Sequence, residues 1–228
     1  MPLIILTALL FVVGFAPQLW VRYIMRKYAK ELPDLPGTGG ELAEHLIERL
    51  NLEQTRLEQT DEGGDHYDPA ENSVRLSPSN YEGKSLTAVA VAAHEVGHAI
   101  QFVRQEPVSQ LRGKYIPLSI ALRKAGVFML LALPVVTVLL RSPSAVAMFI
   151  GLSLLLQLGG AMAYLVILPE EWDASFNKAL PILIEGEYLQ EDQVEPVRQV
   201  LKAAALTYFA AALADVLNIG RWFLILRR

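Results

Sequence analysis

The stretch that decides the fold runs from Leu86 to Val103 and reads LTAVAVAAHEVGHAIQFV. A helix that is apolar on every side is typical of a buried position. Within it, His94 and His98 lie on one helical face, and Glu95 lies about 100° round the axis. Burying such polar groups costs several kcal/mol, roughly, unless they are paired or bound to a metal. The alternative is a chance pattern of solvated or hydrogen-bonded histidines, but the apolar context favours a zinc site with its own general base.

A zinc site of this kind needs a third protein ligand and leaves a fourth position for water. The chain contains no cysteine, so it forms no disulfides and its ligands must be nitrogen or oxygen atoms. The candidates are His45, His66, Glu170, Glu171 and Asp173. Glu171 is the preferred ligand, although helical periodicity barely separates it from the two neighbouring carboxylates.

Long apolar segments predict membrane spans. The 228 residues are 53% hydrophobic and have a mean hydropathy of +0.32, which is high for a soluble protein. Residues 1–21 and 145–168 carry no charge, and 125–140 is a shorter apolar run. A span needs about 20 apolar residues. With a tight turn at 141–144, residues 115–168 are expected to form a transmembrane helical hairpin.

The flanking charges predict the orientation of the spans. No basic residue precedes the first span, which favours an uncleaved anchor over a signal peptide. By the positive-inside rule, the basic residues that follow it place its C-terminal side in the cytoplasm. These residues are Arg22, Arg26, Lys27 and Lys30. Residues 203–226 are apolar but contain Asp215, Asn218 and Arg221, so they fit either a fourth span or an amphipathic surface helix.

Smaller elements are expected between the anchor and the zinc helix. Residues 33–40 are rich in Pro and Gly and predict a linker, whereas 41–52 has helical spacing. Residues 73–77 read as a short strand. The edge of that strand could bind an extended peptide through main-chain hydrogen bonds, or the strand could be purely structural.

The expected fold is mainly α: a polytopic helical membrane protein with a membrane-proximal zincin-like (gluzincin) catalytic region and a minor β element. Five regions follow from the sequence. They are an N-terminal transmembrane anchor (1–22), a cytoplasmic region with the zinc helix (23–114), a transmembrane helical hairpin (115–168), a helical segment with the third zinc ligand (169–202), and a C-terminal transmembrane or membrane-associated helix (203–228).

Several motifs together resemble the YugP-like membrane zinc metallopeptidases, over nearly the whole chain. They are YDP at 67–69, RLS at 75–77, YEG at 81–83, AVAVAAHEVGHAIQ at 88–101, LP at 168–169, EWDAS at 171–175 and KAAALTY at 202–208. A more distant similarity is to HtpX-type membrane peptidases, in which a Glu-x-x-Ala-Asp motif supplies the third ligand. That resemblance implies Glu171 as the ligand, and it leaves Ser175 where the other family has Asp.

The expected activity is that of a membrane-bound zinc endopeptidase, with one Zn²⁺ per chain held by His94, His98 and Glu171. Glu95 would take a proton from the attacking water and return it to the leaving amine. Asp173 is a candidate for orienting one of the imidazoles. His66 has three interpretations: a structural hydrogen-bond donor at a turn, a group that contacts substrate, or an extra metal ligand.

The expected partners are a polypeptide substrate and the lipid bilayer. A net charge of -4 gives no sign of nucleic-acid binding, and the oligomeric state cannot be read from the chain. The expected location is a bacterial-type cell membrane, with several spans and the active site on the cytoplasmic side, where membrane-protein quality control is one role. The alternative is a zinc-stabilised membrane scaffold or partner-binding protein without proteolytic activity.

Overall fold

The computed structural model describes residues 2–52 and 54–212. The chain divides into two compact units. The first, here called the body, comprises residues 19–110 and 168–207; the second, here called the hairpin unit, comprises the remainder. Most of the predicted C-terminal span at 203–226, with its three polar residues, lies outside the described residues.

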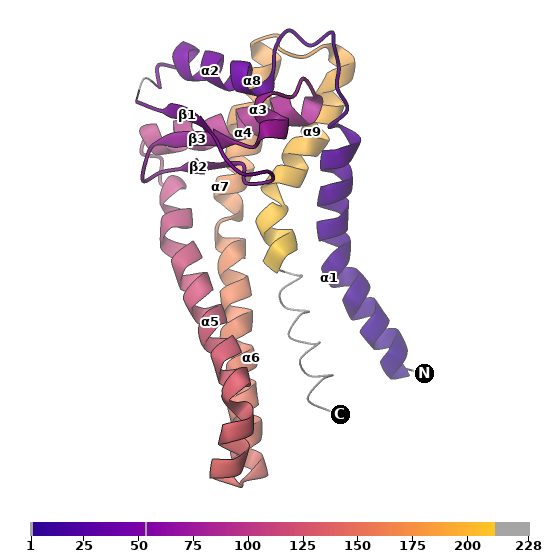
Figure 1. Cartoon of the computed structure of the whole chain (residues 1–228), viewed down its shortest axis with the longest axis vertical. Helices are drawn as coiled ribbons and strands as arrows, with labels where there is room; N and C mark the ends of the chain where they lie inside the picture. The colour runs from indigo at the N-terminus through magenta and orange to yellow at the C-terminus, as the bar shows by residue number, and fades with distance from the viewer. Residues whose placement is uncertain (1, 53, 213–228) are drawn as a thin grey trace. The chain divides into compact units, whose positions relative to one another are not determined.

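Helix α4 (Leu86–Val103) lies at the centre of the body and has the predicted bounds. Its first turn is capped by Ser85, whose side chain accepts a hydrogen bond from the Ala88 N–H. Every residue from 86 to 101 is buried, because helices and strands of the body pack around it (Figure 1). The all-round apolar pattern of this helix therefore belongs to a protein core.

Helix α2 (Gly39–Arg49) confirms the helix predicted after the linker, with earlier bounds. It starts at Gly39 because Thr38 forms a capping box: its hydroxyl accepts from the Glu41 N–H, and its own N–H donates to Glu41 Oε2 at 2.7 Å. A Cβ at Gly39 would lie 2.8 Å from the Ala88 carbonyl oxygen. Glycine at this position thus lets α2 pack closely on α4.

The β element is a three-stranded sheet in the order β1-β3-β2, formed by β1 (Arg56–Gln59), β2 (His66–Asp68) and β3 (Ser73–Leu76). β3 confirms the predicted strand. It lies in the centre, parallel to β1 and antiparallel to β2, so both of its edges are paired. The open-edge interpretation of residues 73–77 is therefore wrong. The short helix α3 (Pro78–Tyr81) connects the sheet to α4.

The second half of the body is a run of helices that starts at Leu168. It consists of α7 (Leu168–Trp172), the π-helix η1 (Asp173–Ala179) and α8 (Leu180–Glu185), followed by α9 (Glu191–Ala205). Both η1 and α9 pack on α4. The predicted helix after residue 168 is confirmed, but its second segment is wound as a π-helix, a form that is frequent at functional sites.

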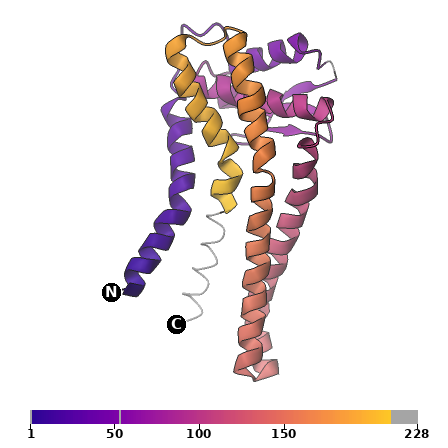
Figure 2. The ribbon, with the colours of Figure 1, turned by 180° about the vertical axis from the view of Figure 1, so that it is seen from behind.

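Helices α5 (Ser109–Leu140) and α6 (Pro143–Val166) form the predicted helical hairpin. Both views of the ribbon show them side by side along their length (Figures 1 and 2). Ser119 Oγ donates to the Gly160 carbonyl at 2.7 Å, and Ser153 Oγ donates to the Gly126 carbonyl at 2.6 Å. Small residues and interhelical hydrogen bonds of this kind are typical of helix pairs in membranes. Helix α1 (Pro2–Lys27) covers the predicted anchor.

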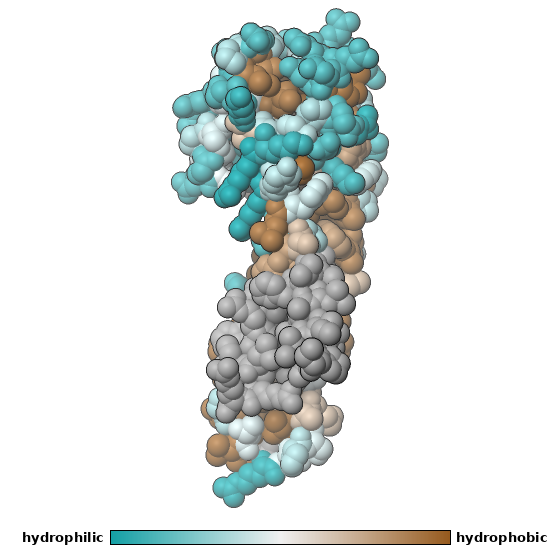
Figure 3. Space-filling model, turned by 90° about the vertical axis from the view of Figure 1, so that its right-hand side faces the viewer, coloured by the Kyte–Doolittle hydropathy of each residue, from teal (hydrophilic) through white to brown (hydrophobic). Residues whose placement is uncertain are grey.

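Three helices in the described part of the chain are long and apolar enough to cross a membrane by length and composition: Leu86–Val103, Pro107–Leu139 and Pro143–Glu185. The first is α4, which is buried in the body. The other two expose many large apolar side chains, such as Phe128, Leu155 and Met148. In the space-filling view, hydrophilic side chains gather over the body (Figure 3).

Candidate metal centre

Three buried side chains of the body converge on one point. His94 and His98 come from α4, and Glu171 comes from α7. The two Nε2 atoms are 3.3 Å apart, and Glu171 Oε2 is 3.4 Å from each of them. Gly97 allows α4 to lie close to η1, the segment that follows α7, because a Cβ at Gly97 would lie 2.7 Å from the Ala174 carbonyl oxygen. Among the described residues, this is the group of three ligands that could hold a metal ion.

Hydrogen bonds on the far side of each imidazole fix which nitrogen carries the hydrogen. His94 Nδ1 is 3.0 Å from Ser175 Oγ, which is also 3.1 Å from the Leu201 carbonyl. The carbonyl can only accept, so Ser175 donates to it and accepts from His94 Nδ1–H. His98 Nδ1 is 2.9 Å from Gln101 Oε1. In the neutral tautomer with the hydrogen on Nδ1, each Nε2 lone pair faces the Glu171 carboxylate oxygen.

Three lone-pair donors at this spacing fit a cation. In a tetrahedral zinc site with bonds of about 2.0–2.1 Å, two ligand atoms lie about 3.3–3.4 Å apart. The triangle formed by His94, His98 and Glu171 matches that spacing on all sides. A cation held by the three ligands would also interact favourably with the buried Glu171 carboxylate. The residues present therefore fit zinc.

Glu95 is a buried polar residue that follows His94 on α4. Its side chain is 6% exposed, and its Oε2 atom has no hydrogen-bond partner within the described residues. A buried carboxylate oxygen without a hydrogen-bond partner lowers the stability of the folded protein, and most buried polar atoms therefore have one. A water molecule or substrate group at the site would satisfy it. A general base needs such a free acceptor oxygen, and this role for Glu95 stays a prediction.

Asp173 is linked to the metal group through Gln101, to which it bonds and which in turn contacts His98. Its Oδ2 atom accepts a hydrogen bond from Gln101 Nε2 at 2.8 Å and from Lys178 Nζ at 3.0 Å. Burial raises the pKa of Asp173, but hydrogen bonds from Gln101, Asn177 and Lys178 outweigh burial and hold this pKa below its ordinary value. Burial lowers the pKa of Lys178, and its bonds to Asp173 and Glu106 more than reverse that effect. The partner that contacts His98 is Gln101.

The other predicted candidates lie outside the ligand triangle. His66 on β2 has its Nδ1 atom 2.6 Å from the Gly64 carbonyl, where it donates a hydrogen bond at a turn. Glu170 is buried beside Glu171, with Oε1 4.0 Å from His98 Nδ1. His45 on α2 contacts Tyr188. The structure thus groups Glu171, rather than these candidates, with the two histidines.

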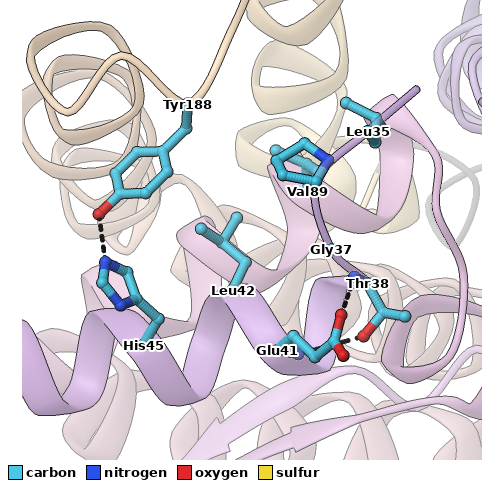
Figure 4. A pocket seen from close by; sticks show the side chains of 9 residues that line it. Leu35, Gly37, Thr38, Glu41, Leu42, His45, Val89 and Tyr188 are labelled. Atoms are coloured by element: carbon cyan, nitrogen blue, oxygen red, sulfur yellow. Dashed lines mark hydrogen bonds between the residues drawn. The ribbon is translucent and has the colours of Figure 1, made fainter.

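His45 belongs to a separate hollow of about 430 Å³ (Figure 4). The Tyr188 hydroxyl is 2.8 Å from His45 Nε2 and accepts from Arg49 at 2.7 Å. The hollow is lined by Leu35, Pro36, Gly37, Thr38, Glu41, Leu42, His45, Val89 and Tyr188. The polar side chains drawn there pair with one another, and the three metal ligands do not line it.

Of the two residues that hold the imidazoles, Gln101 was not singled out from the sequence, and Ser175 was noted only as a departure from the related family's motif. Gln101 is three residues after His98, and Ser175 is four residues after Glu171. Residues at these spacings are neighbours on a helix. A search for polar side chains one turn from each ligand would have found both.

Comparisons with known proteins identify the family of the chain. Residues 3–227 match a protein family described as "Putative neutral zinc metallopeptidase". The chain is also 34% identical, over 224 residues, to the "Putative membrane protease YugP" of Bacillus subtilis (strain 168), covering 97% of this chain and 95% of the relative. No solved structure matches the chain. The family match spans nearly the whole sequence, and the chain therefore belongs to this family of neutral zinc metallopeptidases.

Proposed function

We propose that the chain is a membrane-bound zinc endopeptidase in which His94, His98 and Glu171 hold the metal and Glu95 is the general base. The observations that support this most are the buried ligand triangle and the buried, unpartnered oxygen of Glu95, the residue after His94. Three protein ligands are the usual number in catalytic zinc sites, whereas structural sites are closed by four. This count favours an enzyme over a zinc-stabilised scaffold.

The chemistry divides between the metal and the chain. A bound zinc ion would act as a Lewis acid that lowers the pKa of its water and polarises the peptide carbonyl. Glu95 accepts the proton that the attacking water loses and later donates it to the leaving amine. Ser175 keeps the Nδ1 hydrogen on His94, so that the Nε2 lone pair stays directed into the site.

The test is hydrolysis of unfolded casein by detergent-purified, zinc-loaded protein, with zinc content measured for each variant. Glu95→Gln keeps the size of the side chain but cannot take up the proton, so we expect the rate to fall by about 10²- to 10⁴-fold with zinc retained. Glu44→Gln, on the exposed side of α2, is the matched control and should keep full activity. Equal rates for the parent and Glu95→Gln, with zinc in both, would overturn the role of Glu95.

We further propose that α1, α5 and α6 cross the bilayer, with the body in the cytoplasm. The proposed substrates are cytoplasmic segments of membrane proteins that are degraded during quality control. These segments should accumulate uncleaved in cells that express only Glu95→Gln, as measured by proteomics.

Because the chain has no cysteine, single introduced cysteines report the topology of the protein directly. An impermeant maleimide should label Ser144→Cys in intact cells and Glu44→Cys only after permeabilisation. The reverse pattern would contradict this orientation.

A further inference from the structure

The side-chain amide of Gln101 joins the two segments that carry the metal ligands. Gln101 is fully buried at 0% exposure. Its Nε2 atom lies 2.9 Å from the Glu170 carbonyl and 2.8 Å from Asp173 Oδ2. Both of these partners can only accept, so both amide hydrogens are used. The amide orientation is thereby fixed, and Oε1 must face His98 Nδ1 at 2.9 Å.

Asp173 is held in place by Lys178, which also bonds to Glu106. Lys178 Nζ is 3.0 Å from Asp173 Oδ2 and 3.0 Å from Glu106 Oε2. Glu106 follows α4 in the chain, and its backbone N–H donates to the Gln101 carbonyl at 2.9 Å. A continuous network of hydrogen bonds and ion pairs, here called the circuit, therefore links His98, Gln101, Asp173, Lys178 and Glu106, and it returns to α4 through the Glu106 backbone.

We propose that Gln101 is the positioning residue of the zinc site, which holds His98 with its Nε2 lone pair directed at the metal and keeps Glu171 in register with α4. The proposal rests on the zinc site described above. In water a neutral imidazole can carry its hydrogen on either nitrogen, so a fixed acceptor on Nδ1 selects the ligand form. The bond from the same amide to the Glu170 carbonyl holds the residue next to Glu171.

Zinc affinity is the direct readout, measured by competition with a chromogenic chelator on detergent-purified protein. Gln101→Met keeps the length of the side chain but removes the acceptor and both donors. We expect its dissociation constant for zinc to rise by about 10- to 100-fold, as for other residues that orient metal-bound histidines. Gln110→Met, an exposed glutamine in the first turn of α5, is the matched control and should bind zinc like the parent. An unchanged affinity of Gln101→Met would overturn the proposal.

A conservative variant separates positioning of His98 from packing. Gln101→Glu keeps an oxygen on His98 Nδ1, but its second oxygen would face two acceptors, Asp173 Oδ2 and the Glu170 carbonyl. Asp173→Asn is therefore added, so that the asparagine amide can donate to that oxygen. If Gln101 acts on the metal through His98, the double variant should keep most of the parent's zinc affinity, and its cobalt(II)-loaded form should keep the parent visible spectrum. A loss of more than about 10-fold in the double variant would overturn the role on His98. Both readouts compare the double variant with the parent, so they stay decisive if Gln101→Met does not fold.

Asp173 tests the outer part of the circuit. Asp173→Ala leaves the Gln101 bond to the Glu170 carbonyl in place, so we expect a smaller loss of affinity than for Gln101→Met. A larger loss would show that Asp173 acts independently of Gln101. The proposed function fails separately, because a parent that binds no zinc or cleaves no casein would refute it. Failure of the Gln101 proposal alone leaves a parent that binds zinc and cleaves casein.

Discussion

Helix α4 and the hairpin helices are all long and apolar enough to cross a membrane, but their surroundings differ. In the most hydrophobic windows, 89% of α4 is buried inside the protein, against 11% of the helix at Pro107–Leu139 and 33% of the helix at Pro143–Glu185. Phe128 is 73% exposed and Leu155 is 64% exposed, whereas Ile100 on α4 is 1% exposed. Hydropathy therefore shows that a helix avoids water, but not whether protein or lipid takes the place of water.

The polar groups of the two regions follow the same division. In α4 the polar side chains His94, Glu95 and His98 are buried, two of them belong to the candidate metal group, and burial strengthens their interactions. In the hairpin, Ser119 and Ser153 bond only to the backbone of the facing helix. Buried ionisable side chains like those of α4 are costly and indicate a functional site, whereas serine–backbone bonds between helices indicate helix packing.

The largest effect is expected from truncating an apolar residue in α4. Ile100→Ala leaves a cavity among fixed neighbours and should lower the free energy of unfolding by about 2–5 kcal/mol. Leu155→Ala on α6 is the matched change at an exposed position and should alter it by less than about 0.5 kcal/mol. Denaturant titration in detergent micelles, followed by circular dichroism, measures both. Similar losses at the two positions would show that the hairpin face is also packed against protein.

The glycines of the two regions give the next largest contrast. Gly97→Ala on α4 would bring Cβ to 2.7 Å from the Ala174 carbonyl oxygen. The two backbones must separate, which should cost about 1–3 kcal/mol and weaken zinc binding. Gly151→Ala on α6 has no atom within 4 Å of the added Cβ and should be neutral or stabilise the helix by up to about 1 kcal/mol. Stable, zinc-replete Gly97→Ala protein would contradict the close contact.

Patterns that repeat within one segment were predictable from the sequence. The apolar run at 86–103 gave the bounds of α4, and the spacing of His94 and His98 gave two of the ligands. Helical periodicity alone could not choose among Glu170, Glu171 and Asp173, because all three fall within one turn. The resemblance to known peptidases implied Glu171, and the structure groups that residue with the histidines.

Contacts between distant segments were not predictable in the same way. β1 and β2 are four and three residues long and mostly polar, so they lack a clear alternation and depend on pairing with β3. The π-helical winding of η1 leaves no mark in the spacing of apolar residues. The Gln101 bond to the Glu170 carbonyl joins residues 69 positions apart, and it depends on the packing of η1, which follows α7, on α4.

The smallest effect is expected from the interhelical bonds of the hairpin. Ser153→Ala removes the 2.6 Å bond to the Gly126 carbonyl but preserves the close approach of the helices. Such bonds in membrane proteins contribute about 0.6 kcal/mol on average, so the loss should be near that value, with no change in zinc affinity. Titration with a denaturing detergent measures the loss, and Ser144→Ala at the exposed hairpin turn is the control. A loss of several kcal/mol would mean that the hairpin, like α4, depends on buried polar contacts for its fold.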